Sequence, residues 1–131
     1  MNRIDAIVTA IDNFENITIV SFDAAEQPMR MMALELDKSL VVGSKVTLGV
    51  KASNIALGRG LSGMLSISNQ LKVSIESINN GHLLSSVKFS FAGSLIESII
   101  TRESTLHMNL QADMNIIALI KSSELSILEI R

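Results

Sequence analysis

The chain contains the same stretch of sequence twice. Residues 46–53, Val-Thr-Leu-Gly-Val-Lys-Ala-Ser, return 70 positions later as residues 116–123, Ile-Ile-Ala-Leu-Ile-Lys-Ser-Ser. Nearer the start of the chain the copies match with an offset of 67, because the second copy carries three extra residues. Self-similarity over this length indicates the duplication of one small unit. We therefore divide the chain into two tandem halves, 1–62 and 63–131.

Each half is small for an independent domain, so we expect it to need help from the other half or from other subunits. The chain is 47% hydrophobic, which is high for 131 residues, yet no apolar run approaches the ~20 residues that cross a bilayer. The excess of hydrophobic residues predicts that apolar surface is buried between subunits, and therefore a homo-oligomer. We expect no membrane insertion.

Composition also excludes several functions. The absence of cysteine rules out disulfides, thiolate catalysis and Cys-ligated metal sites. A formal net charge of −2 offers no broad attraction for nucleic acid. His82 and His107 have no acidic partner at metal-ligand spacing, so we expect surface or interface histidines, no protein-ligated metal and no enzyme. The polar N-terminus lacks the apolar centre of a signal peptide, which favours a cytoplasmic location.

Hydrophobic residues alternate or form short runs, which is typical of strands. Short strands separated by Gly, Asn, Asp and Pro turns predict an all-β chain of two small barrels. The expected strands are 4–11, 17–22, 29–34 and 45–50 in the first half, and 71–78, 83–91, 94–100, 115–120 and 125–130 in the second. Residues 35–40 and 101–110 are each expected to form one or two helical turns.

The repeated stretch ends in Lys-small-Ser, as Lys51-Ala52-Ser53 and as Lys121-Ser122-Ser123. A strand that delivers an ammonium group, a hydroxyl and free backbone N–H groups to one place suits an oxyanion, because all three donate hydrogen bonds and one carries charge. Two copies suggest two receptors in each chain.

Four segments resemble the molybdate-binding Mop (TOBE) family: 65–72, Leu-Ser-Ile-Ser-Asn-Gln-Leu-Lys; 99–104, Ile-Ile-Thr-Arg-Glu-Ser; 118–123; and 50–57, which repeats the closing motif. The whole chain resembles a tandem pair, a di-Mop protein. This resemblance implies two OB-like five-stranded barrels with short helical turns. It also implies oligomers, a trimer being favoured over a dimer, whose interfaces hold molybdate or tungstate without an organic cofactor.

The family's motifs can be transferred residue by residue. Its opening Ser-Ala-Arg-Asn falls on residues 66–69, where serine replaces the arginine. The oxyanion-binding residues that the resemblance and the repeat imply are Ser66, Ser68, Asn69, Thr101, Arg102, Ser104, Lys121, Ser122 and Ser123, with Lys51, Ala52 and Ser53 in the first half. The serines could instead cap their own turns, and Thr101 and Ser104 a short helix.

The sequence thus predicts a non-enzymatic intracellular protein that binds molybdate or tungstate for storage or homeostasis. An alternative is a regulatory or interaction module, either associated with the ATPase of a molybdate importer or part of a molybdate-responsive regulator. In that alternative the anion is a signal and contact with a partner protein is the output.

Overall fold

The computed structural model describes all 131 residues, and they form two five-stranded sheets, each curled into a small barrel. The first sheet has the order β10-β4-β1-β2-β3. Its strands are β1 (Asn2–Phe14), β2 (Ile17–Ala24), β3 (Gln27–Ala33), β4 (Lys45–Val50) and β10 (Ser126–Ile130). All neighbours in this sheet are antiparallel.

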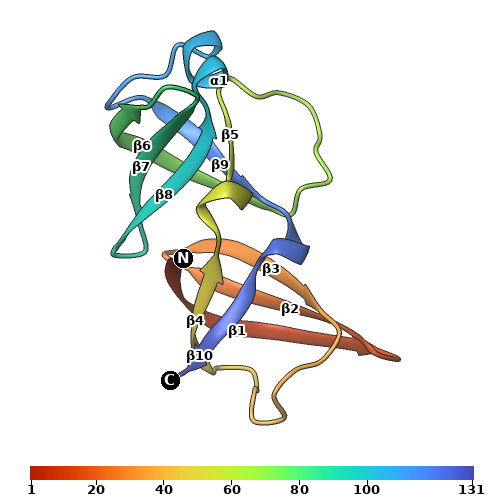
Figure 1. Cartoon of the computed structure of the whole chain (residues 1–131). Coiled ribbons are helices and arrows are strands. Elements are labelled where there is room, and N and C mark those ends of the chain that lie inside the picture. Colours follow the sequence, from red (N-terminus) through yellow and green to blue (C-terminus); the bar gives the residue numbers. More distant parts are fainter.

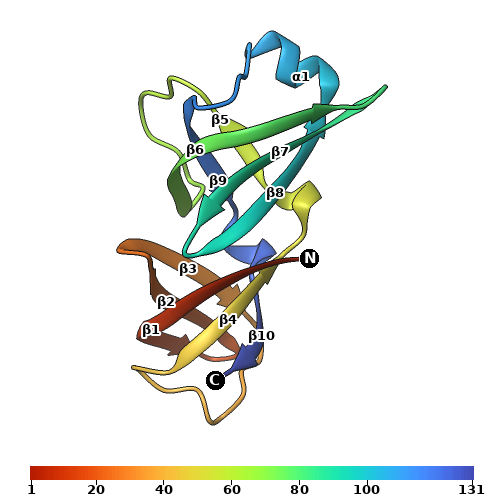
Figure 2. The same cartoon turned by 90° about the vertical axis from the view of Figure 1, so that its left-hand side faces the viewer.

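The second sheet repeats this design in the order β5-β9-β6-β7-β8. Its strands are β5 (Ala56–Gly58), β6 (Asn69–Asn80), β7 (Leu84–Phe91), β8 (Ser94–Thr101) and β9 (Asn115–Ile120). One helix, α1 (Arg102–His107), and two single turns, η1 (Ala52–Asn54) and η2 (Ser122–Glu124), complete the fold. The barrels are stacked, and the N-terminus lies at the waist between them (Figures 1 and 2). The predicted all-β pair of small barrels is confirmed.

Alternation along the strands builds the core of each barrel. In the first part of β1, every second side chain is buried, from Asn2 through Ile4 and Ala6 to Val8, as expected for a strand with one face toward a core. Phe22 and Phe89 occupy equivalent positions 67 residues apart and are both 1% exposed. The duplicated sequence therefore places equivalent side chains at the centres of the two barrels.

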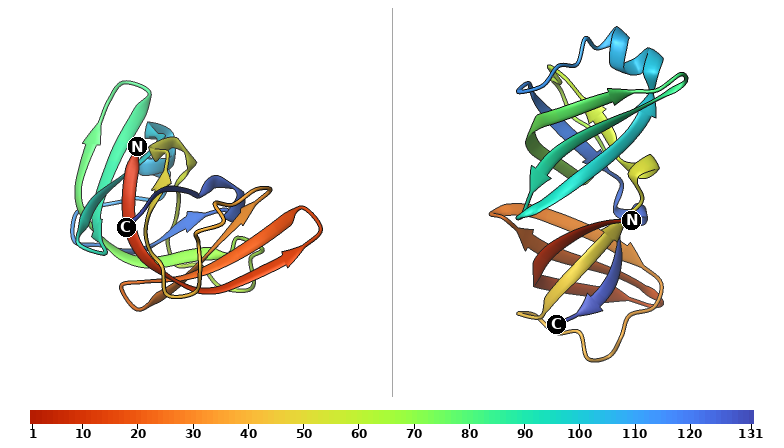
Figure 3. Two further views of the ribbon diagram at one scale, coloured as in Figure 1. Left: turned by 90° about the horizontal axis from the view of Figure 1, so that it is seen from below. Right: turned by 60° about the vertical axis from the view of Figure 1, so that its left-hand side comes forward.

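The last strand of each half belongs to the barrel of the other half. After η1 the chain enters the second sheet, where Leu57 on β5 pairs with Ala118 on β9. After η2 it returns to the first sheet, where Ile127 on β10 pairs with Leu48 on β4. Figure 3 shows these two crossings side by side at the waist. The halves 1–62 and 63–131 remain our proposal for the duplicated unit, but each barrel contains strands from both.

Two asparagines fasten the barrels together at equivalent positions. The Asn69 side chain, 0% exposed, accepts from the Arg30 N–H at 2.7 Å and donates to the Arg30 and Ile120 carbonyls, each at 2.9 Å. The Asn2 side chain donates to the Glu97 carbonyl at 2.7 Å and accepts from its N–H at 2.9 Å. Each amide thus satisfies backbone groups on the third strand of the opposite barrel.

One predicted element is wrong and one was missed. Residues 35–40 form no helix, because the Asp37 carboxylate accepts from the Ser39 N–H and hydroxyl and so stabilises a local turn. Residues 101–110 do contain a helix, α1. The short strand β5 was missed because its three residues carry no periodic pattern.

The structure contains no helix with the length and hydrophobicity needed to span a membrane.

The asparagine contacts predict a graded loss of stability. Asn69→Ala leaves buried backbone groups of Arg30 and Ile120 without partners, so the free energy of unfolding should fall by about 2–3 kcal/mol. Asn2→Ala removes fewer hydrogen bonds, so we expect a loss of about 1–2 kcal/mol. Urea unfolding measures both. The exposed Asn13, which donates only to Thr18 Oγ1, is the control, and an equally large loss in Asn13→Ala would contradict the assignment.

The strand exchange predicts that the halves fold only together. A fragment of residues 1–62 should lack a stable fold because the first barrel needs β10 from the other half. A fragment of residues 63–131 should also lack a stable fold, because the second barrel needs β5. Co-expressed, the two fragments should associate with native circular dichroism. A well-dispersed amide NMR spectrum from either fragment alone would contradict this expectation.

Candidate oxyanion site

The two Lys-Ser motifs meet at the waist of the molecule. Lys51 directly precedes η1 and Lys121 directly precedes η2, both in extended backbone conformation. The two turns are joined by a hydrogen bond of 2.8 Å from Asn54 Nδ2 to Glu124 Oε2. Two motifs that are 70 residues apart in the sequence therefore lie together in the structure.

Each turn presents hydrogen-bond donors that the protein itself does not use. The two ion pairs of the structure are Arg3–Glu129 and Arg131–Asp5, so neither Lys51 nor Lys121 is neutralised. The hydroxyls of Ser53, Ser122 and Ser123 take part in none of its side-chain hydrogen bonds. The first N–H groups of a helical turn have no partner within the turn. None of the loop or turn bonds between backbone groups starts from Ala52, Ser53, Ser122 or Ser123.

The segment that precedes β6 adjoins the second turn. Asn69 is opposite Ile120 in the antiparallel pair of β6 and β9, so the preceding Ser68 lies opposite Lys121. Ser66 and Ser68 are both exposed. The side chain of Asn69 is occupied by backbone groups, so it holds the strand in place rather than offering a free donor. The structure thus brings Ser68 and Asn69 to Lys121, while Ser66 lies in the exposed segment that precedes them.

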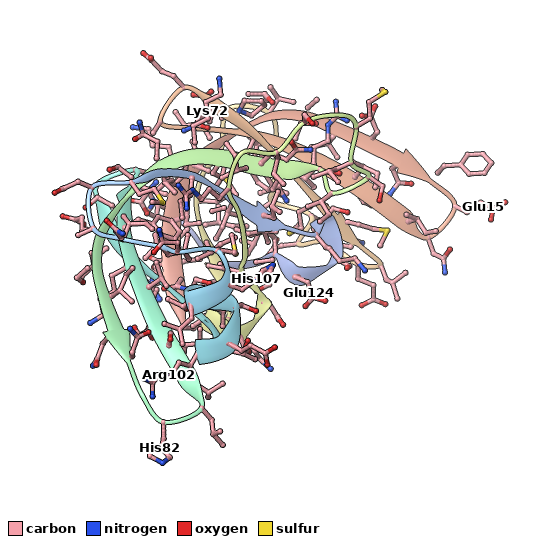
Figure 4. All side chains as sticks on the ribbon, turned by 90° about the horizontal axis from the view of Figure 1, so that it is seen from above. Glu15, Lys72, His82, Arg102, His107 and Glu124 are labelled. Carbon is pink, nitrogen blue, oxygen red and sulfur yellow. The ribbon has the colours of Figure 1, made fainter.

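Thr101, Arg102 and Ser104 lie elsewhere, at the end of the second barrel that is remote from the waist (Figure 1). Thr101 caps α1: its Oγ1 accepts from the Ser104 N–H at 3.1 Å and donates to Ser104 Oγ at 2.9 Å. The capping role weighed for these residues is confirmed for Thr101, and Ser104 is its partner within the helix. Arg102 is exposed and projects from the same end (Figure 4). Within one chain, this group does not join the donors at the waist.

The remaining polar groups offer no competing chemistry. His82 is exposed near the tip of the β6–β7 hairpin and His107 is exposed on α1 (Figure 4). No group of three His, Cys, Asp or Glu side chains could hold a metal ion. Hydrogen bonds from Ser39 lower the pKa of Asp37. Asp37 lines a groove between β3 and β10 that contains none of the predicted residues.

Three contacts between the barrels or their connecting turns were not foreseen from the sequence. The Asn54–Glu124 hydrogen bond joins positions that are equivalent in the repeat, 70 residues apart. The alignment of the halves shows this equivalence, but not that the two positions touch. The contacts of Asn2 and Asn69 with the opposite barrel were missed for the same reason, because a repeat reveals equivalence and not proximity.

Comparisons with known proteins agree with this architecture. Residues 65–127 match the model of the TOBE domain. No curated protein matches the sequence. A crystal structure of the cytoplasmic molybdate-binding protein ModG with molybdate bound superposes with a TM-score of 0.88 at 23% identity, covering 96% of this chain and 94% of that chain. The predicted resemblance is thereby confirmed: residues 65–127 match the TOBE domain model, and over nearly its whole length the chain has the fold of ModG.

Proposed function

We propose that this protein binds molybdate or tungstate reversibly, without catalysis, and serves in the storage or homeostasis of the oxyanion. The observation that carries the proposal is the meeting of two Lys-Ser turns at the waist, each with an unpaired lysine and unused donors. The ModG structure, which has the same fold and contains molybdate, supports this choice of anion.

The chemistry of the donors suits a tetrahedral dianion. Burying such an ion requires several converging donors, because the desolvation of both partners must be offset. Ammonium, hydroxyl and backbone N–H groups together provide charge and direction, and each charge-assisted hydrogen bond contributes about 1.5–3 kcal/mol. The twelve predicted residues form our candidate set, in which Asn69 positions β6, Thr101 caps α1 and the others offer donors.

We propose that the complete site forms between copies of the chain. The group around Thr101, Arg102 and Ser104 lies far from the waist of its own chain (Figure 1), so only another copy brings it to a Lys-Ser turn. Large apolar side chains exposed near the ends of both long hairpins support association, among them Phe14 at 78% and Leu83 at 79%. Such surface is commonly buried in oligomers. A trimer is the assembly that we favour, and the cytoplasm the location.

Native mass spectrometry tests the proposal directly, because it reports the oligomer and the number of bound ions together. Protein is exchanged into volatile buffer with molybdate, with sulfate, or with both. We expect an oligomer that retains molybdate when sulfate is in excess. An oligomer that binds neither ion, or both equally, would contradict a function in molybdate or tungstate binding.

Of the two lysines, Lys121 should contribute more to the affinity for molybdate. Lys121→Ala removes an unpaired cation beside Ser68 and η2, so the affinity for molybdate should fall at least about tenfold. Isothermal titration calorimetry measures the change. Lys38→Ala is the matched control, because it removes the same charge from an exposed loop position away from the waist. An equal loss in both variants would show a net-charge effect and no site at Lys121.

A further inference from the structure

Strand β3 of the first barrel runs beside β6 of the second, although the two strands belong to different sheets. The Gln27 side chain donates to the Lys72 carbonyl at 3.2 Å and accepts from its N–H at 3.0 Å. Three residues further along β3, and three residues back along β6, Asn69 bonds the backbone of Arg30. Side-chain amides therefore hold β3 and β6 antiparallel to each other.

This alignment brings Arg30 to the oxyanion site. One atom, Asn69 Nδ2, lies 2.9 Å from both the Arg30 carbonyl and the Ile120 carbonyl. Ser68 precedes Asn69, and Lys121 follows Ile120. The turn η2 also packs against β3. Arg30 is exposed, and its guanidinium takes part in neither ion pair of the structure.

The equivalent position in the other barrel carries the opposite charge. There Asn2 bonds the backbone of Glu97, which stands 67 residues after Arg30. The turn η1 packs against β8, the strand that contains Glu97, and Ser98 on that strand donates to the Ile55 carbonyl at 2.6 Å. The Glu97 carboxylate accepts from Ser86 Oγ on β7. The strand that packs against η1 thus carries an acidic residue where the strand that packs against η2 carries a basic one.

On this basis we propose that Arg30 is a binding residue of the site at η2, where it supplies a second cation from the opposite barrel, and that Glu97 disfavours a dianion at η1. Guanidinium binds tetrahedral oxyanions through two parallel hydrogen bonds, whereas a carboxylate repels them. Glu124 is the acidic group on η2 itself, and its carboxylate accepts from Asn54. The two receptors of one chain are thus unequal, and η2 is the tighter. This inference rests on the proposed function.

Calorimetric titration of the full-length protein with sodium molybdate tests it. Arg30→Gln should lower the affinity at least about tenfold. It should leave the unfolding midpoint unchanged, because Asn69 contacts only the backbone of residue 30. Arg30→Lys should keep part of the affinity, since it keeps the charge but loses the paired donors. Lys38→Gln controls for net charge.

A charge exchange provides the decisive variant. In the double variant Arg30→Glu with Glu97→Arg, the tighter receptor should move to η1, so Lys51→Ala rather than Lys121→Ala should then weaken binding. If the wild type binds molybdate and Arg30→Gln binds equally well, the role of Arg30 is overturned while the proposed function stands. If the wild type binds no molybdate, both fail. Dependence on Lys121 that persists after the charge exchange would also overturn the inequality of the receptors.

Discussion

The exchange of the last strand between the two barrels is the constraint on which the rest of the structure depends. Because β5 completes the second sheet and β10 the first, the chain must cross between the barrels twice, and both crossings occur directly after the Lys-Ser motifs. The exchange therefore fixes η1 and η2 at the waist. The buried amides of Asn2 and Asn69 hold the barrels in this arrangement by satisfying backbone groups of the opposite barrel.

Duplication followed by divergence explains how two turns with nearly the same backbone, η1 and η2, can differ in their proposed affinity for an oxyanion. The backbone at the waist is almost symmetric: lysine, helical turn and exchanged strand follow one another in both halves. The residues around it are not symmetric in charge, because Arg30 is matched by Glu97 and Asn54 by Glu124. Electrostatic interactions with a dianion depend on these few charges, whereas the fold depends on the buried residues that the two halves share. Divergence at exposed positions can therefore change binding without disturbing the barrels.

Much of the fold was predictable because it is recorded in local patterns. Alternation of buried and exposed positions identified nine of the strands within a few residues, and the capping chemistry of Thr101 correctly predicted α1. The helical turns expected at residues 35–40 failed because the Asp37 side chain bonds Ser39, a local competition that hydrophobic periodicity does not reveal. Strand β5 was missed because it exists only through its pairing with β9.

For the candidate site, the sequence by itself determined the ingredients: two Lys-Ser motifs, the duplication that relates them, and the class of ligand that such donors suit. Only the tertiary structure decided which of these residues meet. The turns that follow Lys51 and Lys121 are joined at the waist. Ser68 lies opposite Lys121 through the register of β6 and β9, and the backbone of Arg30 comes from the other barrel, while Thr101 and Ser104 lie at the far end. Composition and spacing are properties of one stretch of chain. Proximity depends on strand pairing between distant segments, which no single stretch of sequence contains.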